Sequence, residues 1–131
     1  MREKLLILMK EVLAGDERLI FAYAFGSFAR EEPFWDIDLA IYIKDPEQNP
    51  LIITSDIQAE LSRAAQKKTL DLTADEFDVQ IINSAPFPFL KNIFLEGILL
   101  LDRDPDLRTE VIEYVSSKYR ECAGLLAEVS L

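Results

Sequence analysis

Residues 25–38, FGSFAREEPFWDID, place a Gly-Ser turn between an apolar segment and two aspartates, and this stretch constrains the chain most. We expect Asp36 and Asp38 to open a strand, where residues two apart point to the same face. Two adjacent carboxylates repel each other unless a cation lies between them. Mg²⁺ takes oxygen ligands, often one or two carboxylates together with substrate phosphates. With backbone N–H groups at Gly26 and Ser27 available to hold an anion, the stretch predicts a site for a metal-bound nucleoside triphosphate.

The length and charge of the chain limit the classes of function that it can serve. Its 131 residues suit one domain, 1–131, with a core of its own. The net charge is −10, from 24 acidic and 14 basic residues. Because nucleic-acid binding depends on a basic surface, we predict no direct nucleic-acid contact and favour a basic protein partner. The chain has no histidine, which excludes Ser-His-Asp machinery and imidazole bases.

The distribution of apolar residues predicts no membrane association. No apolar run approaches the ~20 residues that span a bilayer. The first residues resemble a signal peptide superficially, but Lys10 and Glu11 interrupt the apolar run, and an amphipathic helix explains it better. The single cysteine, Cys122, fits a reducing compartment, so we expect a cytoplasmic protein.

Alternating helix and strand patterns predict an α/β (α+β) fold. Apolar periodicity and turn residues predict helices over 2–14, 28–31, 54–68, 86–96 and from 105 onward, and strands over 19–25, 36–44, 77–82 and 98–101. Ser27, the pair Ser55 and Gln58, and Asp104 are the expected helix caps. The connector from Gly26 to Trp35 is too short for a parallel crossover. We therefore predict a mixed sheet of about four strands flanked by helices.

A third carboxylate completes the predicted metal site. Phosphoryl transfer needs metal ions, positioning and charge neutralisation more than covalent help from the protein. Asp78, the second residue of the third strand, converges with Asp36 and Asp38 if that strand lies beside the second. Asp75 and Glu76 remain alternatives for this role. Arg30 is a candidate phosphate contact, with a surface salt bridge as the competing interpretation.

Several other side chains have structural interpretations that we favour over functional ones. Trp35 and Phe34 could line a nucleobase site, but core packing is the favoured interpretation. Lys91 is expected at a solvated helix position. Tyr114, Tyr119 and Cys122 share the apolar face of the last helix and are expected in the core or an interface.

The segments GSFAR, DIDLAIY, and FDVQIINSAP running into FLEGILLLDRD resemble the minimal nucleotidyltransferases of the DNA polymerase beta-like superfamily. The resemblance covers roughly residues 19–115. It implies a mixed sheet with flanking helices and a site for two Mg²⁺ ions. By position, Gly26 and Ser27 would hold the triphosphate, Asp36 and Asp38 would bind metal, and Asp78 would complete the site.

Many members of this family are antitoxins paired with a HEPN-domain RNase toxin. The resemblance implies transfer of AMP from ATP to a tyrosine hydroxyl of such a toxin, and it leaves both homo- and hetero-oligomers open. An acidic surface agrees with a protein acceptor.

Two other functions are weighed against this one. The loop from Ser27 to Asp36 is shorter than is usual in the family and carries Glu31 and Glu32, which favours a catalytically inactive module that neutralises its partner by stoichiometric binding. The second alternative is a D-x-D phosphatase of the haloacid dehalogenase type. That family has a threonine where this chain has Ala40, and no Gly-Ser turn precedes its aspartates, so both features argue against it.

Overall fold

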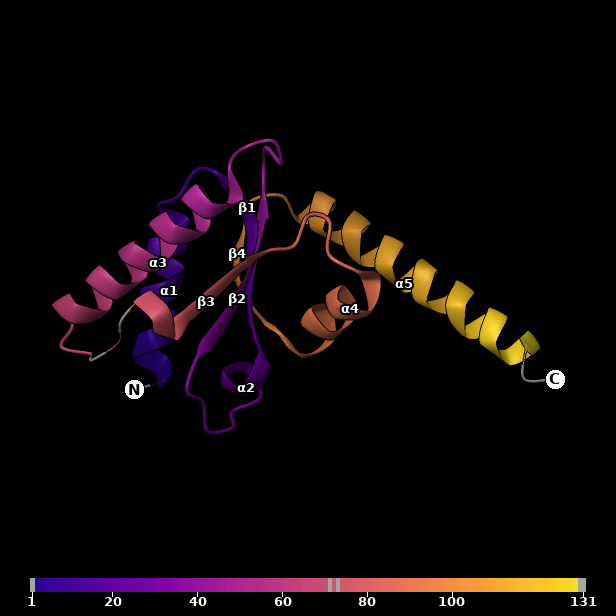
Figure 1. Cartoon of the computed structure of the whole chain (residues 1–131), viewed down its shortest axis with the longest axis horizontal. Helices are drawn as coiled ribbons and strands as arrows, with labels where there is room; N and C mark the ends of the chain where they lie inside the picture. The colour runs from indigo at the N-terminus through magenta and orange to yellow at the C-terminus, as the bar shows by residue number, and fades with distance from the viewer. Residues whose placement is uncertain (1, 71, 73, 130–131) are drawn as a thin grey trace.

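In a computed structural model, a four-stranded sheet lies between two pairs of longer helices (Figure 1). The structure describes residues 2–70, 72 and 74–129, without the side chains of residues 75 and 122–129. The elements follow one another as α1 (Arg2–Ala14), β1 (Leu19–Phe25), α2 (Gly26–Ala29), β2 (Ile37–Ile43), α3 (Pro50–Lys67), the 3-10 turn η1 (Ala74–Glu76), β3 (Phe77–Ile81), α4 (Phe87–Glu96), β4 (Ile98–Asp102) and α5 (Pro105–Val129).

The sheet is mixed, as the sequence predicts. Its order is β3-β2-β1-β4; β1 runs antiparallel to both β2 and β4, and β2 runs parallel to β3. The short connector between β1 and β2 therefore carries an antiparallel turn, since a parallel crossover needs a dozen or more residues. This arrangement brings the end of β1 to the same edge of the sheet as the starts of β2 and β3.

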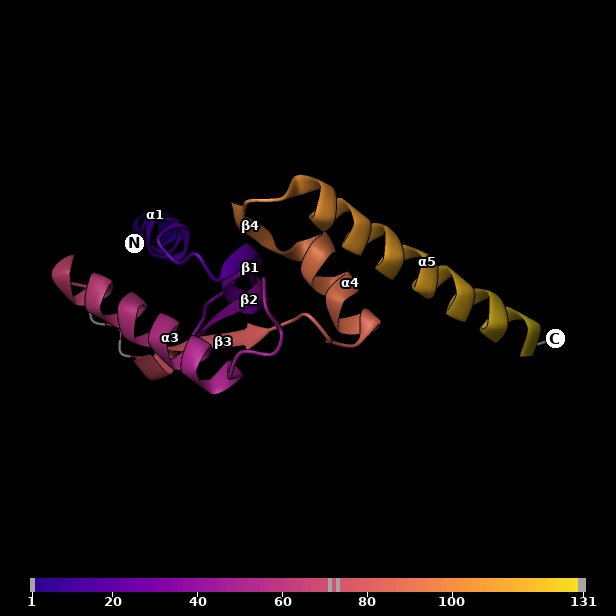
Figure 2. The same cartoon turned by 90° about the horizontal axis from the view of Figure 1, so that it is seen from above.

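Helices cover both faces of the sheet (Figure 2). On one face α1 and α3 pack side by side over a large apolar cluster that includes Leu5, Leu39 and Ile57. On the other face α4 packs over Phe21 and Tyr23 of β1. Fully burying a large apolar side chain contributes about 1.5–3 kcal/mol, so the two clusters hold the strand ends that carry the predicted site in fixed positions.

The start of α3 differs from the prediction. The helix begins at Pro50, after Asn49, whose Oδ1 accepts a hydrogen bond of 3.0 Å from the backbone N–H of Leu51. The predicted capping box of Ser55 and Gln58 is wrong. Proline is preorganised for the first turn of a helix, so the apparent loop contributes the first turn of α3. Gln58 instead donates a 2.7 Å hydrogen bond to the backbone carbonyl of Phe77, at the start of β3.

Helix α5 starts where the sequence predicts but lies more exposed than expected. Asp104 Oδ1 accepts a 3.1 Å hydrogen bond from the N–H of Leu107, which confirms the predicted cap. Among the described side chains of α5, only Val115 is buried. Tyr114 and Tyr119 are 61% and 43% exposed, because α5 extends past the sheet that its apolar stripe would cover (Figure 1). The core position is therefore wrong for both tyrosines, and their place in an interface stays a prediction. The side chain of Cys122 lies outside the described residues.

Lys91 is not the fully solvated residue that the sequence predicts. Its Nζ lies 3.9 Å from the centre of the Tyr119 ring, so it links α4 to α5 through a cation–π contact. Among the described residues, none of the helices combines the length and apolar character that crossing a bilayer requires.

Candidate active site

Gly26 joins the end of β1 to α2 and takes a positive φ of 73°. Residues with a Cβ adopt this left-handed conformation only at a cost. A Cβ at this position would also lie 2.3 Å from Oδ2 of Asp38. The glycine therefore lets the Asp38 carboxylate approach the backbone of the turn. The two halves of the predicted constellation meet in space across the connector that separates them in the sequence.

Ser27 is not the helix cap that the sequence predicts. Helix α2 begins at Gly26, with Phe25 at the capping position, so Ser27 lies within the first turn. The reason is Gly26, whose positive φ turns the chain one residue before the serine. The carbonyl of Ser27 accepts a 3.0 Å hydrogen bond from the N–H of Glu32, which folds the start of the loop back onto α2. Ser27 still follows Gly26 beside the carboxylates, as a phosphate contact requires.

Asp38 and Asp78 lie directly opposite each other on neighbouring strands. In the parallel pairing of β2 and β3, Asp38 is the register partner of Asp78. On its other side, Asp38 pairs with Phe25, the last residue of β1. Burial raises the pKa of the Asp38 carboxyl, and the negative charge of Asp78 raises it further. The fold thus maintains a repulsive pair of acids beside Gly26.

Side chains at both ends of β3 hold this register. Gln58 bonds to Phe77 at the start of the strand. Just beyond its end, Asn83 accepts a 2.9 Å hydrogen bond from the N–H of Ile43 and donates one of 2.9 Å to the Ile43 carbonyl. Because both ends are fixed to neighbouring elements, Asp78 stays opposite Asp38. This placement favours Asp78 over the neighbouring acids Asp75 and Glu76 as the third carboxylate.

Asp36 lies just outside the strand that was expected to contain it. Strand β2 begins at Ile37, and Asp36 is exposed in the bend before it. Its charge nonetheless contributes to the raised pKa of Asp38. Asp36 is therefore electrostatically part of the acidic group, although only Asp38 and Asp78 are held opposite each other by the sheet.

The chemistry of this group fits a divalent cation. Carboxylate oxygens are hard ligands of the kind that Mg²⁺ takes, and a cation between Asp38 and Asp78 would relieve their repulsion. Within the part of the chain that the structure describes, no set of three or more acidic or sulfur-bearing side chains forms a ready-made metal cage. The protein supplies two opposed carboxylates and a nearby third, which leaves positions for the phosphate oxygens of a substrate.

Arginines flank the Gly-Ser turn, but loop acids already pair with them. Arg30 Nε lies 2.6 Å from Glu32 Oε1, and its guanidinium lies 3.6 Å from Glu96 Oε2. The positive charge of Arg30 lowers the pKa of Asp38, against the larger effects that raise it. Arg30 is thus near the acids yet held by an ion pair, as the competing interpretation predicts.

Arg2 is a flanking residue that sequence reasoning misses. Its guanidinium lies 4.4 Å from the centre of the Phe28 ring in α2, and its Nε lies 4.0 Å from Glu31 Oε1. No local pattern could have found it, because α1 reaches the turn only through the packing of the sheet.

The two aromatic residues before Asp36 point in opposite directions. Phe34 packs edge-to-face on Phe28, with ring centres 5.0 Å apart, so the predicted core packing is confirmed for this residue. For Trp35 it is wrong, since the residue is 93% exposed. Trp35 and Asp36 form a bend before β2, and the tryptophan is left in solvent while Phe34 packs inward.

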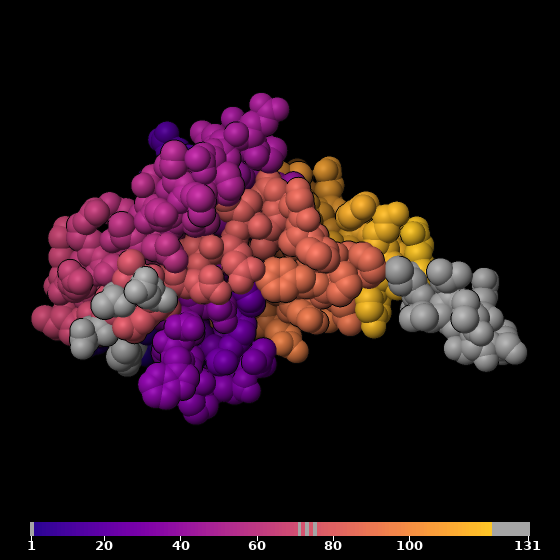
Figure 3. All heavy atoms as spheres, in the orientation of Figure 1, coloured from indigo at the N-terminus to yellow at the C-terminus, as the bar shows by residue number. Residues whose placement is uncertain are grey.

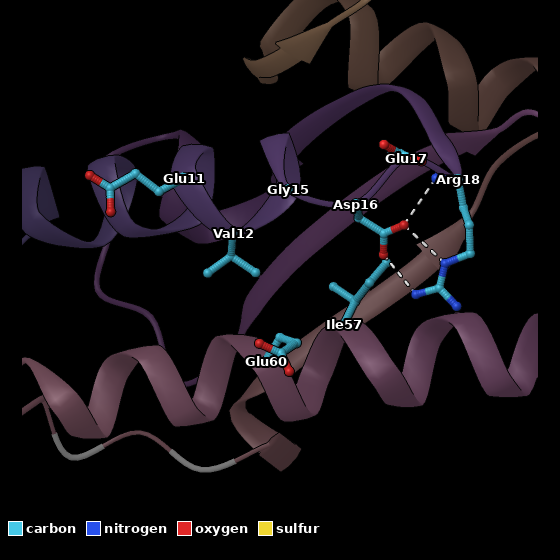
Figure 4. A pocket seen from close by; sticks show the side chains of 8 residues that line it. All are labelled: Glu11, Val12, Gly15, Asp16, Glu17, Arg18, Ile57 and Glu60. Atoms are coloured by element: carbon cyan, nitrogen blue, oxygen red, sulfur yellow. Dashed lines mark hydrogen bonds and ion pairs between the residues drawn. The ribbon is translucent and has the colours of Figure 1, made fainter.

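A second acidic region lies at the opposite end of β1. A pocket of about 610 Å³ is lined there by Glu11, Val12, Gly15, Asp16, Glu17, Arg18, Ile57 and Glu60 (Figure 4). In it Arg18 holds Asp16 through a hydrogen bond of 2.7 Å from Nη2 to Oδ2 and one of 2.9 Å from Nε to Oδ1. Arg18 also reaches Asp56 on α3 at 3.0 Å. Asp16 here is thus paired with an arginine, whereas Asp38 beside Gly26 faces another acid.

Two solved toxin–antitoxin complexes contain a chain with a similar fold. A structure described as a tri-AMPylated Shewanella oneidensis HEPN toxin in complex with MNT antitoxin matches with a TM-score of 0.60 and 18% identity, over 99% of this chain and 97% of that one. A toxin–antitoxin structure with AMP-PNP matches with a TM-score of 0.58 and 19% identity, over 98% and 95%. At these identities the likeness shows the fold. A comparison with curated proteins found no significant match.

The family model described as Polymerase beta, Nucleotidyltransferase matches residues 8–106. The match includes the Gly-Ser turn, Asp36, Asp38 and Asp78, and it favours nucleotidyl transfer over the D-x-D phosphatase alternative. The chain belongs to the polymerase beta nucleotidyltransferase family.

Proposed function

We propose that this protein is an Mg²⁺-dependent adenylyltransferase that transfers AMP from ATP to a hydroxyl of a HEPN-domain toxin, with tyrosine as the acceptor residue. The observation that carries the proposal is the opposed pair of Asp38 and Asp78 beside Gly26. Family membership and the AMPylated toxin in a complex of the same fold support it. The pair would act as a toxin–antitoxin system, and we expect it in the cytoplasm.

Each site residue has a role that its position suggests. Asp36 and Asp38 would bind the metal of the nucleotide, and Asp78 would complete a two-ion site. The ions would neutralise charge on the phosphates and lower the pKa of the acceptor hydroxyl. Gly26 and Ser27 would receive the triphosphate at the turn. Arg30 would exchange its pairing with Glu32 for one with a phosphate oxygen.

The transfer balances without another co-reactant. The acceptor oxygen bonds to the α-phosphorus of ATP, and the bond from that phosphorus to the bridging oxygen of the β-phosphate breaks. Pyrophosphate leaves with the bonding electrons. The hydroxyl proton passes to a carboxylate of the site, and Asp78 is suitably placed because it is exposed on the edge strand.

The test uses ATP labelled at the α-phosphorus, Mg²⁺ and the protein encoded by the neighbouring gene, as the candidate HEPN-domain toxin. We expect label on the partner, and a loss of several orders of magnitude when Asp36→Asn is combined with Asp38→Asn, because the metal's charge stabilisation is worth several kcal/mol. Glu11→Gln with Glu17→Gln removes the same charge at the other end of β1 and should leave the transfer intact. Absence of label with the wild-type protein would refute the proposal.

A second candidate function follows from the pairing of Arg30 with Glu32 and Glu96. If those acids hold Arg30 away from phosphate, the chain is an inactive module that neutralises the toxin by binding alone. This candidate predicts that the double aspartate variant still blocks the partner's RNase activity at equimolar concentration. If the chain is an adenylyltransferase, the variant should no longer block the RNase activity of the partner.

A further inference from the structure

Trp35 stands out among the apolar side chains on the surface. It is the only tryptophan in the chain and is 93% exposed, more than any other exposed large apolar residue that the structure describes. It lies in the loop between α2 and β2, on the part of the molecule that projects at the bottom of Figures 1 and 3. Single apolar residues are common on protein surfaces. The exposure of Trp35 is notable because the next residue is Asp36, a candidate catalytic carboxylate.

The loop presents Trp35 outward from an anchored base. Phe34, the preceding residue, packs on Phe28 inside the domain, and Glu32 is hydrogen-bonded back to the carbonyl of Ser27. Because its neighbours are held, the exposure of Trp35 does not require the loop to be loose. A preorganised aromatic side chain loses little conformational entropy when it binds.

The position of Trp35 relative to Asp36 decides what it can meet. Consecutive Cα atoms are 3.80 Å apart across a trans peptide. An acceptor side chain is only several ångströms long, so the surface that carries the hydroxyl must approach the carboxylates closely. Trp35 therefore falls within the footprint of any protein acceptor. Buried tryptophans near the centre of an interface are the commonest residues with large binding contributions.

We propose that Trp35 is the docking anchor for the acceptor protein, an inference that rests on the proposed function. The matching surface is an apolar pocket with a basic rim, because Glu31, Glu32 and Asp36 lie within four residues of the tryptophan in the chain, which carries a net charge of −10. The adenine of ATP is the competing occupant. Solvent reaches nearly the whole Trp35 side chain. A nucleobase stacked on one face of the indole ring would leave the other face in water, whereas a protein pocket would enclose both faces of the ring.

Tryptophan fluorescence tests the occupant directly, because Trp35 is the only tryptophan of this chain. The candidate HEPN-domain partner should shift the emission to shorter wavelength and protect it from acrylamide. The same mixture with Trp35→Phe supplies the background from the partner. AMP-PNP with Mg²⁺ but no partner should leave the emission unchanged. Quenching by the nucleotide alone, without protection by the partner, would overturn the proposal in favour of a base-stacking site.

Kinetics separates docking from chemistry. Trp35→Ala should raise KM for the partner roughly 30-fold, the effect of a typical interface hot spot, with kcat and nucleotide affinity unchanged. Trp35→Phe should restore part of the loss. Leu51→Ala is the matched control, since Leu51 is 74% exposed at the far end of β2. An unchanged KM in Trp35→Ala, with transfer by the wild type intact, would overturn the inference and leave the proposed function standing.

The two hypotheses fail in different ways. If the wild-type protein places no label on the partner, the proposed function is wrong. Protection of Trp35 by that partner would then show docking without catalysis. If label is transferred but the partner neither protects Trp35 nor responds to its substitution, only the docking inference is wrong.

Discussion

Acidic side chains lie at both ends of strand β1, and the pKa of the acid is shifted in opposite directions at the two ends. Before the strand, the side chain of Arg18 hydrogen-bonds to Asp16 and holds the pKa of that carboxyl below its ordinary value of 3.8. After the strand, burial raises the pKa of Asp38, and the charge of Asp78 adds to the effect. At one end Arg18 pairs with Asp16, and at the other end the repulsion between Asp38 and Asp78 is only partly offset by the charge of Arg30.

The difference separates structural from functional carboxylates. An ionised acid with a lowered pKa contributes stability, whereas one with a raised pKa costs stability that another partner must compensate. Two opposed acids beside a glycine, one of them with a raised pKa, indicate a site whose partner is a ligand. Pocket size alone does not identify the candidate active site. The pocket of about 610 Å³ lies at the other end of β1, where Asp16 is paired with Arg18.

Among single substitutions that probe this comparison, the largest effect should come from closing the turn beside Asp38. Gly26→Ala adds a Cβ that would lie 2.3 Å from Asp38 Oδ2, at a positive φ. We expect AMP transfer to fall at least ~100-fold, because displacing a catalytic group by about 1 Å is enough for such a loss. Stability to urea should fall by about 2 kcal/mol.

Gly15→Ala is the matched control for this change. Its Cβ would lie 3.5 Å from the carbonyl of Val12, an ordinary contact, so we expect a stability change within about 0.5 kcal/mol and normal transfer. Equal effects of the two substitutions would contradict the role given to Gly26.

An intermediate effect is expected at the structural end. Asp16→Asn weakens the paired hydrogen bonds to Arg18 and should destabilise the protein by about 1–3 kcal/mol near neutral pH. Because the folded pKa of Asp16 is lowered, its contribution is present above 3.8 and is lost as the pH falls through the folded value.

Urea unfolding of wild type and Asp16→Asn over this pH range checks the prediction. The two curves should converge in acid. Glu17→Gln, which replaces the exposed acid next to Asp16, should track the wild type at every pH. A gap between wild type and Asp16→Asn that persists in acid would show that packing, not charge, is responsible.

The smallest effect should have the opposite sign. The raised pKa of Asp38 means that its ionisation costs stability near neutral pH, a cost that disappears as the pH falls through the folded value. Without metal, Asp38→Asn should therefore stabilise the protein by a few tenths to about 1 kcal/mol, the range for cross-strand pairs.

Thermal unfolding with and without Mg²⁺ completes this comparison. Mg²⁺ should raise the Tm of the wild type in a concentration-dependent manner and leave that of Asp38→Asn unchanged. Glu47→Gln removes an exposed acid beyond the other end of β2 and should keep the wild-type response. A metal-free Asp38→Asn variant less stable than the wild type would contradict the repulsion between the two strands.

Local rules locate most elements of this chain from the sequence alone. The apolar run 19–25 matches β1, Asp104 caps α5, and the short connector after Gly26 predicts an antiparallel pairing. Where the prediction fails, a neighbouring residue changes the local outcome. Pro50 advances the start of α3, and Gly26 turns the chain before Ser27 can cap it.

The mixed sheet and the order of the candidate site residues follow from the sequence: a Gly-Ser turn, two aspartates two apart, and an aspartate in a later strand. Three features depend on tertiary contacts: Asp78 lies opposite Asp38, Arg2 reaches Phe28, and Trp35 faces solvent. Sequence periodicity fixes which face of an element a residue occupies. Register, strand order and exposure depend on contacts between segments far apart in the chain, such as those of Gln58 and Asn83 that hold β3 in place.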